Sequence, residues 1–421
     1  MPRPWWLICW LLMALAAIAA PDGLAQAPPP QLRAQLRSVT AAAISLESEQ
    51  KLRAAFEHVY NLEFRPARQL LKEVAAAEPA SATVCAFWAS ALLYEIMAHQ
   101  GSLQSQLFVT SNEFLRYARL PVDPALDASF HRVSALAEQR ARRRLENNPH
   151  DVDGLFALGL VYAGQANYLA GVKAEYVNGV RKGEKAYDLH KRLRKLRPEI
   201  QDTGVVLGVR EYVIGSLPRA TRFLLFFLGA GGNAKRGMEL LQDAAEQGEF
   251  LRTYARVLLT VAWVRAERLD RALPLLQELQ ARYPRNPIFL LELAKLYHQR
   301  ERYAEATQTC RTLLAEVTAH PHNPRIIGPE DALVELALAE ASQGHAERAL
   351  ETLRRVEEIP EANKRVVAQA LLERGKIFDA QGRRPHALAE YQKVLNLGAD
   401  LDSVRKAHAY RRQPYRPETE E

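Results

Sequence analysis

The sequence predicts an all-α protein, an α-solenoid of stacked antiparallel helix pairs forming a superhelix with an irregular central insertion. Strong helix formers, mainly Ala, Leu, Glu, Arg and Gln, dominate the 421 residues, while β-branched residues are sparse. Apolar side chains recur at three- and four-residue steps, as they do on one face of a helix. The same apolar pattern returns after 34 residues, which indicates a repeat array and not a single compact core.

The clearest predicted helix pair begins near Pro287. Its first helix has apolar residues at positions i, i+3, i+4 and i+7, namely Leu290, Leu293, Ala294 and Tyr297. A turn is expected at Arg300 and Glu301. The second helix follows with an apolar stripe formed by Ala306, Cys310 and Leu313. Each helix has one apolar face, so the two are expected to pack against each other and against neighbouring pairs.

The same unit recurs along the chain. Going back 34 residues, Leu293 corresponds to Leu259 and Ala306 to Ala272, and later units centre on Ala349 and Ala387. In four places an alanine precedes a proline by twelve residues: Ala67/Pro79, Ala137/Pro149, Ala186/Pro198 and Ala272/Pro284. We expect each alanine where two helices cross closely, and each proline where the next unit begins, outside a helix interior.

These units resemble tetratricopeptide repeats, with about seven recognisable or degenerate copies between Glu49 and Ala399. The resemblance is strongest from Thr253 onward. Residues 163–180 interrupt the pattern, either as an insertion of about four helical turns or as a helix-elongating segment. The stretch Tyr60–Phe64 and the residues after it also resemble exported bacterial proteins of this repeat type.

The N-terminus has the features of a secretory signal peptide. Arg3 precedes an uncharged, mostly apolar run from Trp5 to Ala20, and small residues allow cleavage after Ala25. An uncleaved anchor is the alternative, and no later segment is expected to cross a bilayer. We therefore expect an exported protein, periplasmic or extracellular. The predicted organisation is a signal peptide at 1–25, a Pro/Ala/Gln-rich linker and first-helix start at 26–45, degenerate repeats at 46–200, a regular array at 201–400 and a polar, disordered tail at 401–421.

After the leader, the chain keeps two cysteines, Cys85 and Cys310, which lie 225 residues apart. A disulfide between them is the less favoured reading even in an oxidising compartment. We expect both to be buried free thiols that pack as small hydrophobic side chains.

The resemblance implies a groove for a protein or peptide partner, lined by the first helix of each unit. On this analogy the groove residues are Tyr254, Val261, Arg265, Lys295, His298, Gln299, Lys376 and Asp379. Some members of the family hold a terminal carboxylate with paired Lys, Asn and Arg side chains. Leu291 and Lys295 occupy slots that would need a Lys and an Asn, so carboxylate-clamp binding is not predicted.

A basic cluster near the centre of the chain includes Arg192, Arg194 and Lys195. Such a cluster is either a solvated helix face or a contact surface for an acidic partner or an anionic membrane. Export argues against a role in nucleic-acid binding, although the net charge is +7.

No nucleophile elbow, zinc-protease motif or phosphate-binding loop is present, so neither a catalytic residue, a cofactor, a metal nor a small-molecule substrate is predicted. The favoured function is a non-enzymatic interaction scaffold in the cell envelope. The alternative is a membrane-surface adaptor for envelope assembly or secretion that uses the basic central region. An enzyme would require a deep pocket with converging ionisable residues between Tyr162 and Gly237.

Overall fold

A computed structural model describes residues 44–101, 103, 121–217, 231–320, 326–399 and 401–417 of the chain. These residues form helices and turns, and no β-strand occurs among them. The chain divides into two compact units, unit 1 (Met1–Leu275) and unit 2 (Leu276–Glu421), with the boundary inside helix α14 (Leu269–Arg282). The predicted leader and most of the predicted linker lie outside the described residues.

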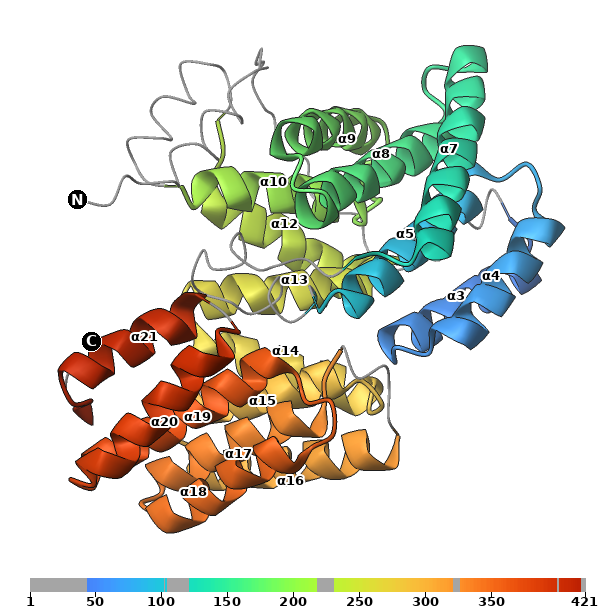
Figure 1. Ribbon diagram of the computed structural model, residues 1–421. Coiled ribbons are helices and arrows are strands. Elements are labelled where there is room, and N and C mark those ends of the chain that lie inside the picture. Colours follow the sequence, from blue (N-terminus) through green and yellow to red (C-terminus); the bar gives the residue numbers. More distant parts are fainter. Residues whose placement is uncertain are drawn as a thin grey trace. The chain divides into compact units, whose positions relative to one another are not determined.

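Unit 1 is a stack of antiparallel helix pairs (Figure 1). The pairs are α3 (Leu46–Tyr60) with α4 (Phe64–Ala77), α5 (Ala82–His99) with α7 (Pro124–Asn147), α8 (Val152–Asn167) with α9 (Tyr176–Leu196), and α10 (Thr203–Gly215) with α12 (Ala234–Gln247), followed by α13 (Arg252–Arg265). Helices α3, α5, α8, α10 and α13 contact one another in that order and form the inner row of unit 1. Helices α4, α7, α9 and α12 form its outer row.

The alanine and proline pattern predicted from the sequence is confirmed. Each of the four alanines has at most 2% of its surface exposed: Ala67, Ala137, Ala186 and Ala272. Each of the four prolines lies in the short turn before the first helix of the next pair: Pro79, Pro149, Pro198 and Pro284. A larger side chain at these alanines would therefore overpack the contact between two helices.

Residues 163–180 lengthen the third helix pair. Helix α8 continues to Asn167 and then widens into a π-helix at Tyr168–Val172, after which α9 starts at Tyr176. Tyr168 is buried, its ring stacks on Phe130 at 4.8 Å, and its hydroxyl donates a hydrogen bond to Asp127 of α7. These contacts tie the widened turn to the neighbouring helix.

The inner row of unit 1 closes on itself. Arg53 of α3 donates hydrogen bonds to the backbone oxygen (3.2 Å) and to Oε1 (2.9 Å) of Glu249, just before α13. Its guanidinium also lies 4.3 Å from the ring centre of Phe250, which in turn lies 5.4 Å from Phe87 of α5. Asp202, just before α10, accepts the backbone N–H groups of residues 249, 250 and 251. The first and last inner helices are thus joined, and the row forms a ring.

Unit 2 repeats the paired arrangement. Its pairs are α15 (Pro287–Gln299) with α16 (Tyr303–Ala319), α17 (Pro329–Ser342) with α18 (Ala346–Arg354), and α19 (Lys364–Ala380) with α20 (Arg384–Leu397); a 3₁₀ turn, η3 (Arg355–Glu358), extends α18. Helices α15, α17 and α19 contact one another in order and form the inner row of unit 2. Ala306, Ala349 and Ala387 are almost fully buried between paired helices, as expected. The predicted fold class, stacked antiparallel helix pairs, is confirmed.

The C-terminal segment differs from the disordered tail expected from its polar composition. Residues Leu401–Arg412 form α21, which packs on α19 and α20. Ala407 is fully buried in the core beside Tyr391. Arg384 donates hydrogen bonds to the backbone oxygens of Tyr410 (2.8 Å) and Arg411 (2.9 Å). A side chain from another helix therefore satisfies the last carbonyl groups of α21 and stabilises a helix whose own apolar face is narrow.

Two helices of unit 1 are apolar and long enough to cross a membrane by length and composition alone, contrary to the sequence-based expectation. They are α5 and the segment Val152–Val172. In these two helices, 72% and 61% of an 18-residue apolar stretch is buried inside the protein. Such burial is typical of the core helices of a helical array. Cys85 and Cys310 are both free and buried, as predicted, and burial raises the pKa of each thiol.

Candidate functional site

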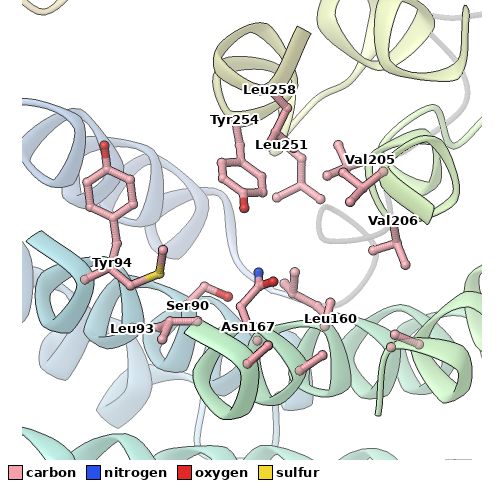
Figure 2. A pocket seen from close by; sticks show the side chains of 18 of the residues that line it. Ser90, Leu93, Tyr94, Leu160, Asn167, Val205, Val206, Leu251, Tyr254 and Leu258 are labelled. Carbon is pink, nitrogen blue, oxygen red and sulfur yellow. The ribbon is translucent and has the colours of Figure 1, made fainter. Parts of the chain in front are cut away.

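The inner helices of unit 1 line a partly open cavity of about 440 Å³. Its walls come from α3, α5, α8, α10 and α13, with α9 contributing on one side. Most of the lining side chains are aliphatic or aromatic, including Phe56, Leu93, Met97, Leu160, Val205 and Leu258. In Figure 2 the labelled side chains of Leu93, Leu160, Val205 and Leu258 converge from separate helices on one space. Cavities of this size and polarity are typical ligand sites.

Few polar groups line this cavity. Tyr254 of α13 and Asn167 at the end of α8 face each other across it (Figure 2), and burial raises the pKa of the tyrosine. The Ser90 hydroxyl is occupied because it donates to the backbone oxygen of Ala86 at 2.9 Å. The two charged lining residues, Glu184 and Arg210, form an ion pair with a closest N–O distance of 3.3 Å. The two charges therefore pair with each other at the cavity wall.

The inner row of unit 2 carries a charged cluster. Lys295 Nζ lies 3.2 Å from Glu292 Oε1 one turn earlier on α15, and the charges of Asp331 and Glu335 on α17 also act on it. Burial raises the pKa of Glu292 to about 7 and that of Asp331 to about 6. Burial opposes the charge on Lys295, but the surrounding carboxylates outweigh it and raise the pKa of the amine. The cluster thus holds three carboxyl groups around one amine.

The structure brings two further predicted groove residues to the same helix. His298 lies one turn after Lys295, and its Nε2 is 3.1 Å from the Ser342 hydroxyl of α17. Burial lowers the pKa of His298. Gln299 is exposed at the end of α15. Lys295 and His298 therefore both face α17 along the inner row of unit 2.

Lys376 and Asp379, the two predicted groove residues of α19, are covered by the C-terminal segment. Lys376 pairs with Glu373 at 3.2 Å and lies 4.6 Å from the ring centre of Tyr415. The Asp379 side chain has no exposed surface and accepts hydrogen bonds from Arg384, from the Tyr391 hydroxyl and from the Tyr415 backbone, each at 2.9 Å. In this structure Asp379 joins α19 to α20 and to the end of the chain.

The predicted groove residues of unit 1 have different surroundings. Tyr254 lines the cavity, whereas Val261 is buried with 8% of its surface exposed. Arg265 is exposed at the end of α13, close enough for its charge to act on Tyr212 of α10. One helix thus supplies a cavity residue, a core residue and a surface residue.

The predicted basic surface lies on α9, in the outer row of unit 1. Arg192 is exposed and donates to the backbone oxygen of Pro149 at 3.0 Å. Arg194 is half-buried, 3.8 Å from Asp243, and burial lowers its pKa. Lys195 is exposed. Arg192 and Lys195 therefore face solvent, whereas Arg194 packs inside the helix array.

The geometry of unit 2 agrees with a comparison of the chain with known families. The family model for the tetratricopeptide repeat matches residues 262–324, which include α15 and α16. The segment 262–324 is thus similar to tetratricopeptide repeats, and the helix pairs around it share the same antiparallel arrangement. The resemblance inferred from residue spacing is confirmed, while the assignment to an exported bacterial type remains a prediction.

Several solved structures of helical repeat proteins are similar over most of the chain. The human IFIT1 dimer with m7Gppp-AAAA is 13% identical, covers 88% of this chain and 88% of its own, and has a TM-score of 0.40. The yeast Tom70 structure is 12% identical, covers 89% and 91%, and has a TM-score of 0.38. A tetratricopeptide repeat protein from Parabacteroides merdae is 15% identical, covers 77% and 98%, and has a TM-score of 0.29. These scores support no inference about ligands, and no curated protein matches the chain.

The sequence analysis missed most of the cavity in the helix array of unit 1. Its lining residues on α3, α5 and α10, such as Phe56, Leu93 and Val206, look like ordinary core positions in the sequence. A signal was nonetheless present in the 163–180 segment and just beyond it. Small residues gather there at helical spacing, and Ala163, Gly164, Ala166, Ala170, Gly179 and Gly183 all line the cavity.

Proposed function

We propose that the chain is a non-enzymatic interaction scaffold of the cell envelope, which holds a segment of a partner protein along the inner row of unit 2. Tetratricopeptide repeats are a protein-binding architecture and are typically non-catalytic, and residues 262–324 match their family model. The observation that carries the proposal is the exposure of the Lys295 side chain on the inner row. Its side chain lies on the inner row beside three carboxyl groups and remains 35% exposed, so a partner can reach it.

The charges around Lys295 favour a basic partner segment. Three carboxyl groups, on Glu292, Asp331 and Glu335, share this one amine, and burial raises the pKa of each. A lysine or arginine side chain of the partner would offset the surplus negative charge and lower these pKa values. The carboxyl groups gain protons as pH falls through about 7 and 6, so binding should weaken between pH 8 and pH 5.5.

The test starts with affinity capture from the envelope fraction of the native host by the mature chain, residues 26–421. The dissociation constant of the captured protein is then measured with Glu335→Gln, which removes one charge at nearly constant shape, and with Glu335→Lys. We expect about tenfold weaker binding for the first variant and a larger loss for the second. The matched control is Glu239→Lys on outer helix α12, where the side chain is 61% exposed. Unchanged affinity in both Glu335 variants, with normal helicity, would contradict a partner site on this row.

The envelope location rests on the predicted leader and has its own test. The full-length chain is expressed in its host, the cells are fractionated, and the N-terminus of the mature protein is sequenced. We expect recovery outside the cytoplasm with Gln26 as the first residue. A chain that keeps Met1 and remains in the cytoplasm would rule out the location but not the partner site.

The alternative, an adaptor on an anionic membrane surface, is favoured by the exposure of Arg192 and Lys195 on outer helix α9. It predicts co-sedimentation with vesicles containing phosphatidylglycerol, lost at high salt and in the double variant Arg192→Gln/Lys195→Gln. The scaffold proposal predicts no such sedimentation. Arg194 is left unchanged in this test because its contacts with Asp243 are internal.

A further inference from the structure

We infer that the cavity of unit 1 is a binding site for the acyl chain of a single-chain lipid. This inference concerns a different unit from the partner site and does not depend on it. Three properties of the cavity carry it: its volume, the two glycines that border empty space, and its mostly apolar lining.

The cavity is a partly open space between the inner helices, so a ligand can reach it from solvent. A volume of about 440 Å³ is too small for a partner helix, which is about 10 Å across with its side chains, and suits a slender ligand.

Two glycines leave space in this cavity that helix packing does not require. A Cβ atom added to Gly164 of α8 would meet nothing nearer than Leu93 Cδ2 at 3.9 Å, and one added to Gly183 of α9 would meet only Ala166 Cβ at 3.9 Å. Both distances are ordinary van der Waals contacts, so alanine would fit at either position. Glycine inside a helix weakens it relative to alanine. The chain therefore gives up some helix stability at two positions that border the same empty space, which is expected where a ligand fills that space.

The polarity of the cavity favours an alkyl chain over a peptide. Every peptide residue brings a backbone N–H and a carbonyl group, and both need partners when they are buried. Here the Ser90 hydroxyl is used by Ala86, and Glu184 and Arg210 satisfy each other. The other polar side chains of the described lining are Asn167 and the tyrosines Tyr60, Tyr94 and Tyr254, which are few for a peptide. An alkyl chain brings no buried polar group and needs none.

The volume matches one long chain. An apolar cavity of about 150 Å³ holds one benzene molecule, so a cavity of about 440 Å³ has room for roughly 18 carbon atoms. That is the size of one long acyl chain, and a lipid with two such chains would not fit. Arg210, the one cationic side chain among the described lining residues, is paired with Glu184, so a lysophospholipid, whose head group would remain outside, suits the site better than a free fatty acid.

The experiment uses the mature full chain and a fluorescent reporter, dansyl-labelled undecanoic acid, which is displaced by lysophosphatidylcholines of 10 to 18 carbons. Each added methylene contributes about fourfold in affinity, so a two-carbon step should tighten binding by about 15-fold until the cavity is full, near 16 to 18 carbons. Palmitate, tested in place of the lysolipid, shows whether the site prefers the acyl chain of a lysolipid or that of a free fatty acid. Tighter binding of the lysolipid supports the assignment, and tighter binding of palmitate refutes the choice of a lysolipid.

Cavity-filling variants test the location of the site. Gly164→Leu and Gly183→Leu each add a side chain into the cavity and should weaken lysolipid binding by at least tenfold. The matched control is Ala76→Leu on the exposed face of outer helix α4, which should bind normally. Gly183→Ala fits the space beside Gly183, so it provides a folded variant if leucine disrupts the helices. It should weaken lysolipid binding only slightly. Failure of every chain length to displace the reporter, or equal binding by the filled and control variants, would overturn the inference.

Discussion

Two glycines in helix α8 should respond in opposite ways to the same substitution. A Cβ atom at Gly159 would lie 2.5 Å from Nε2 of His190, and closer still to Cδ2, whereas one at Gly164 would meet nothing nearer than 3.9 Å. His190 has no exposed surface, and its ring stacks on Phe156 at 5.6 Å with 18° between the planes. The imidazole therefore has no free space into which it could rotate. Gly159→Ala should destabilise unit 1, and Gly164→Ala should stabilise it.

The magnitudes follow from two opposing effects. Replacing glycine by alanine inside a helix stabilises it by about 1 kcal/mol. Overpacking a filled core costs about 1 to 3 kcal/mol, and we take the upper end because normal contacts between carbon atoms are about 3.5 to 4.0 Å. Gly159→Ala should thus lower the free energy of unfolding by about 2 kcal/mol. Gly164→Ala should raise it by about 0.5 to 1 kcal/mol, because only the helix term acts.

Tryptophan fluorescence can follow this unfolding in unit 1 alone. After the predicted leader, the sequence contains only Trp88 and Trp263, and both belong to unit 1. With a urea dependence of about 2 kcal/mol per molar, the two variants should have midpoints about 1 M apart or slightly more, on opposite sides of the wild type. The reasoning is refuted if both midpoints move in the same direction. It is also refuted if Gly159→Ala remains equally harmful after His190→Ala has removed the ring.

Three further predictions concern buried ionisable groups. Burial lowers the pKa of His190 from 6.5 to about 4. The stability that the neutral imidazole provides is therefore complete above pH 6.5 and is lost as pH falls towards 4. Urea unfolding of unit 1 at several pH values should show a loss of up to about 3 kcal/mol in the free energy of unfolding, and His190→Ala should lack this loss. Asp202→Ala removes the acceptor of three backbone N–H groups at the start of α13 and should cost about 3 kcal/mol, with faster hydrogen exchange at residues 249–251 and partial recovery in Asp202→Asn. Asp379→Ala leaves Arg384 without its carboxylate and should lower the free energy of unfolding of unit 2 by about 3 kcal/mol. Trypsin should then cleave α21 faster than in the wild type. Unchanged cleavage would contradict the role assigned to Asp379.

The repeat architecture could be predicted because it rests on local patterns. The tight contacts at Ala186 and Ala349 depend on side-chain size at fixed spacing, and helix periodicity places these residues between paired helices. Ring closure in unit 1 had no local signal, because Arg53 and Glu249 are 196 residues apart. Helix α21 was missed for a similar reason. Its last carbonyl groups are satisfied by Arg384 of another helix, and composition alone cannot show that.

The candidate sites were less predictable than the fold. Lys295 and His298 lie one turn apart, so their common face followed from helix geometry alone. Asp379 occupies an equivalent position near the end of α19, yet its carboxylate is taken up by Tyr391, Arg384 and the Tyr415 backbone. Analogy with other repeat proteins identifies the inner helix but not which of its side chains a later segment will cover.

The 163–180 segment explains why the two units offer such different inner surfaces. In unit 2 the inner helices carry charged side chains such as Lys295 and Glu335, whose carboxylate and amine groups need water or a charged partner. In unit 1 the segment lengthens both α8 and α9 and supplies Gly164, Ala170 and Gly179 to the cavity wall. Small side chains at these positions create the space that apolar side chains of the other inner helices line. The irregularity that interrupts the repeat pattern is therefore the feature that turns one repeat fold into two kinds of binding surface.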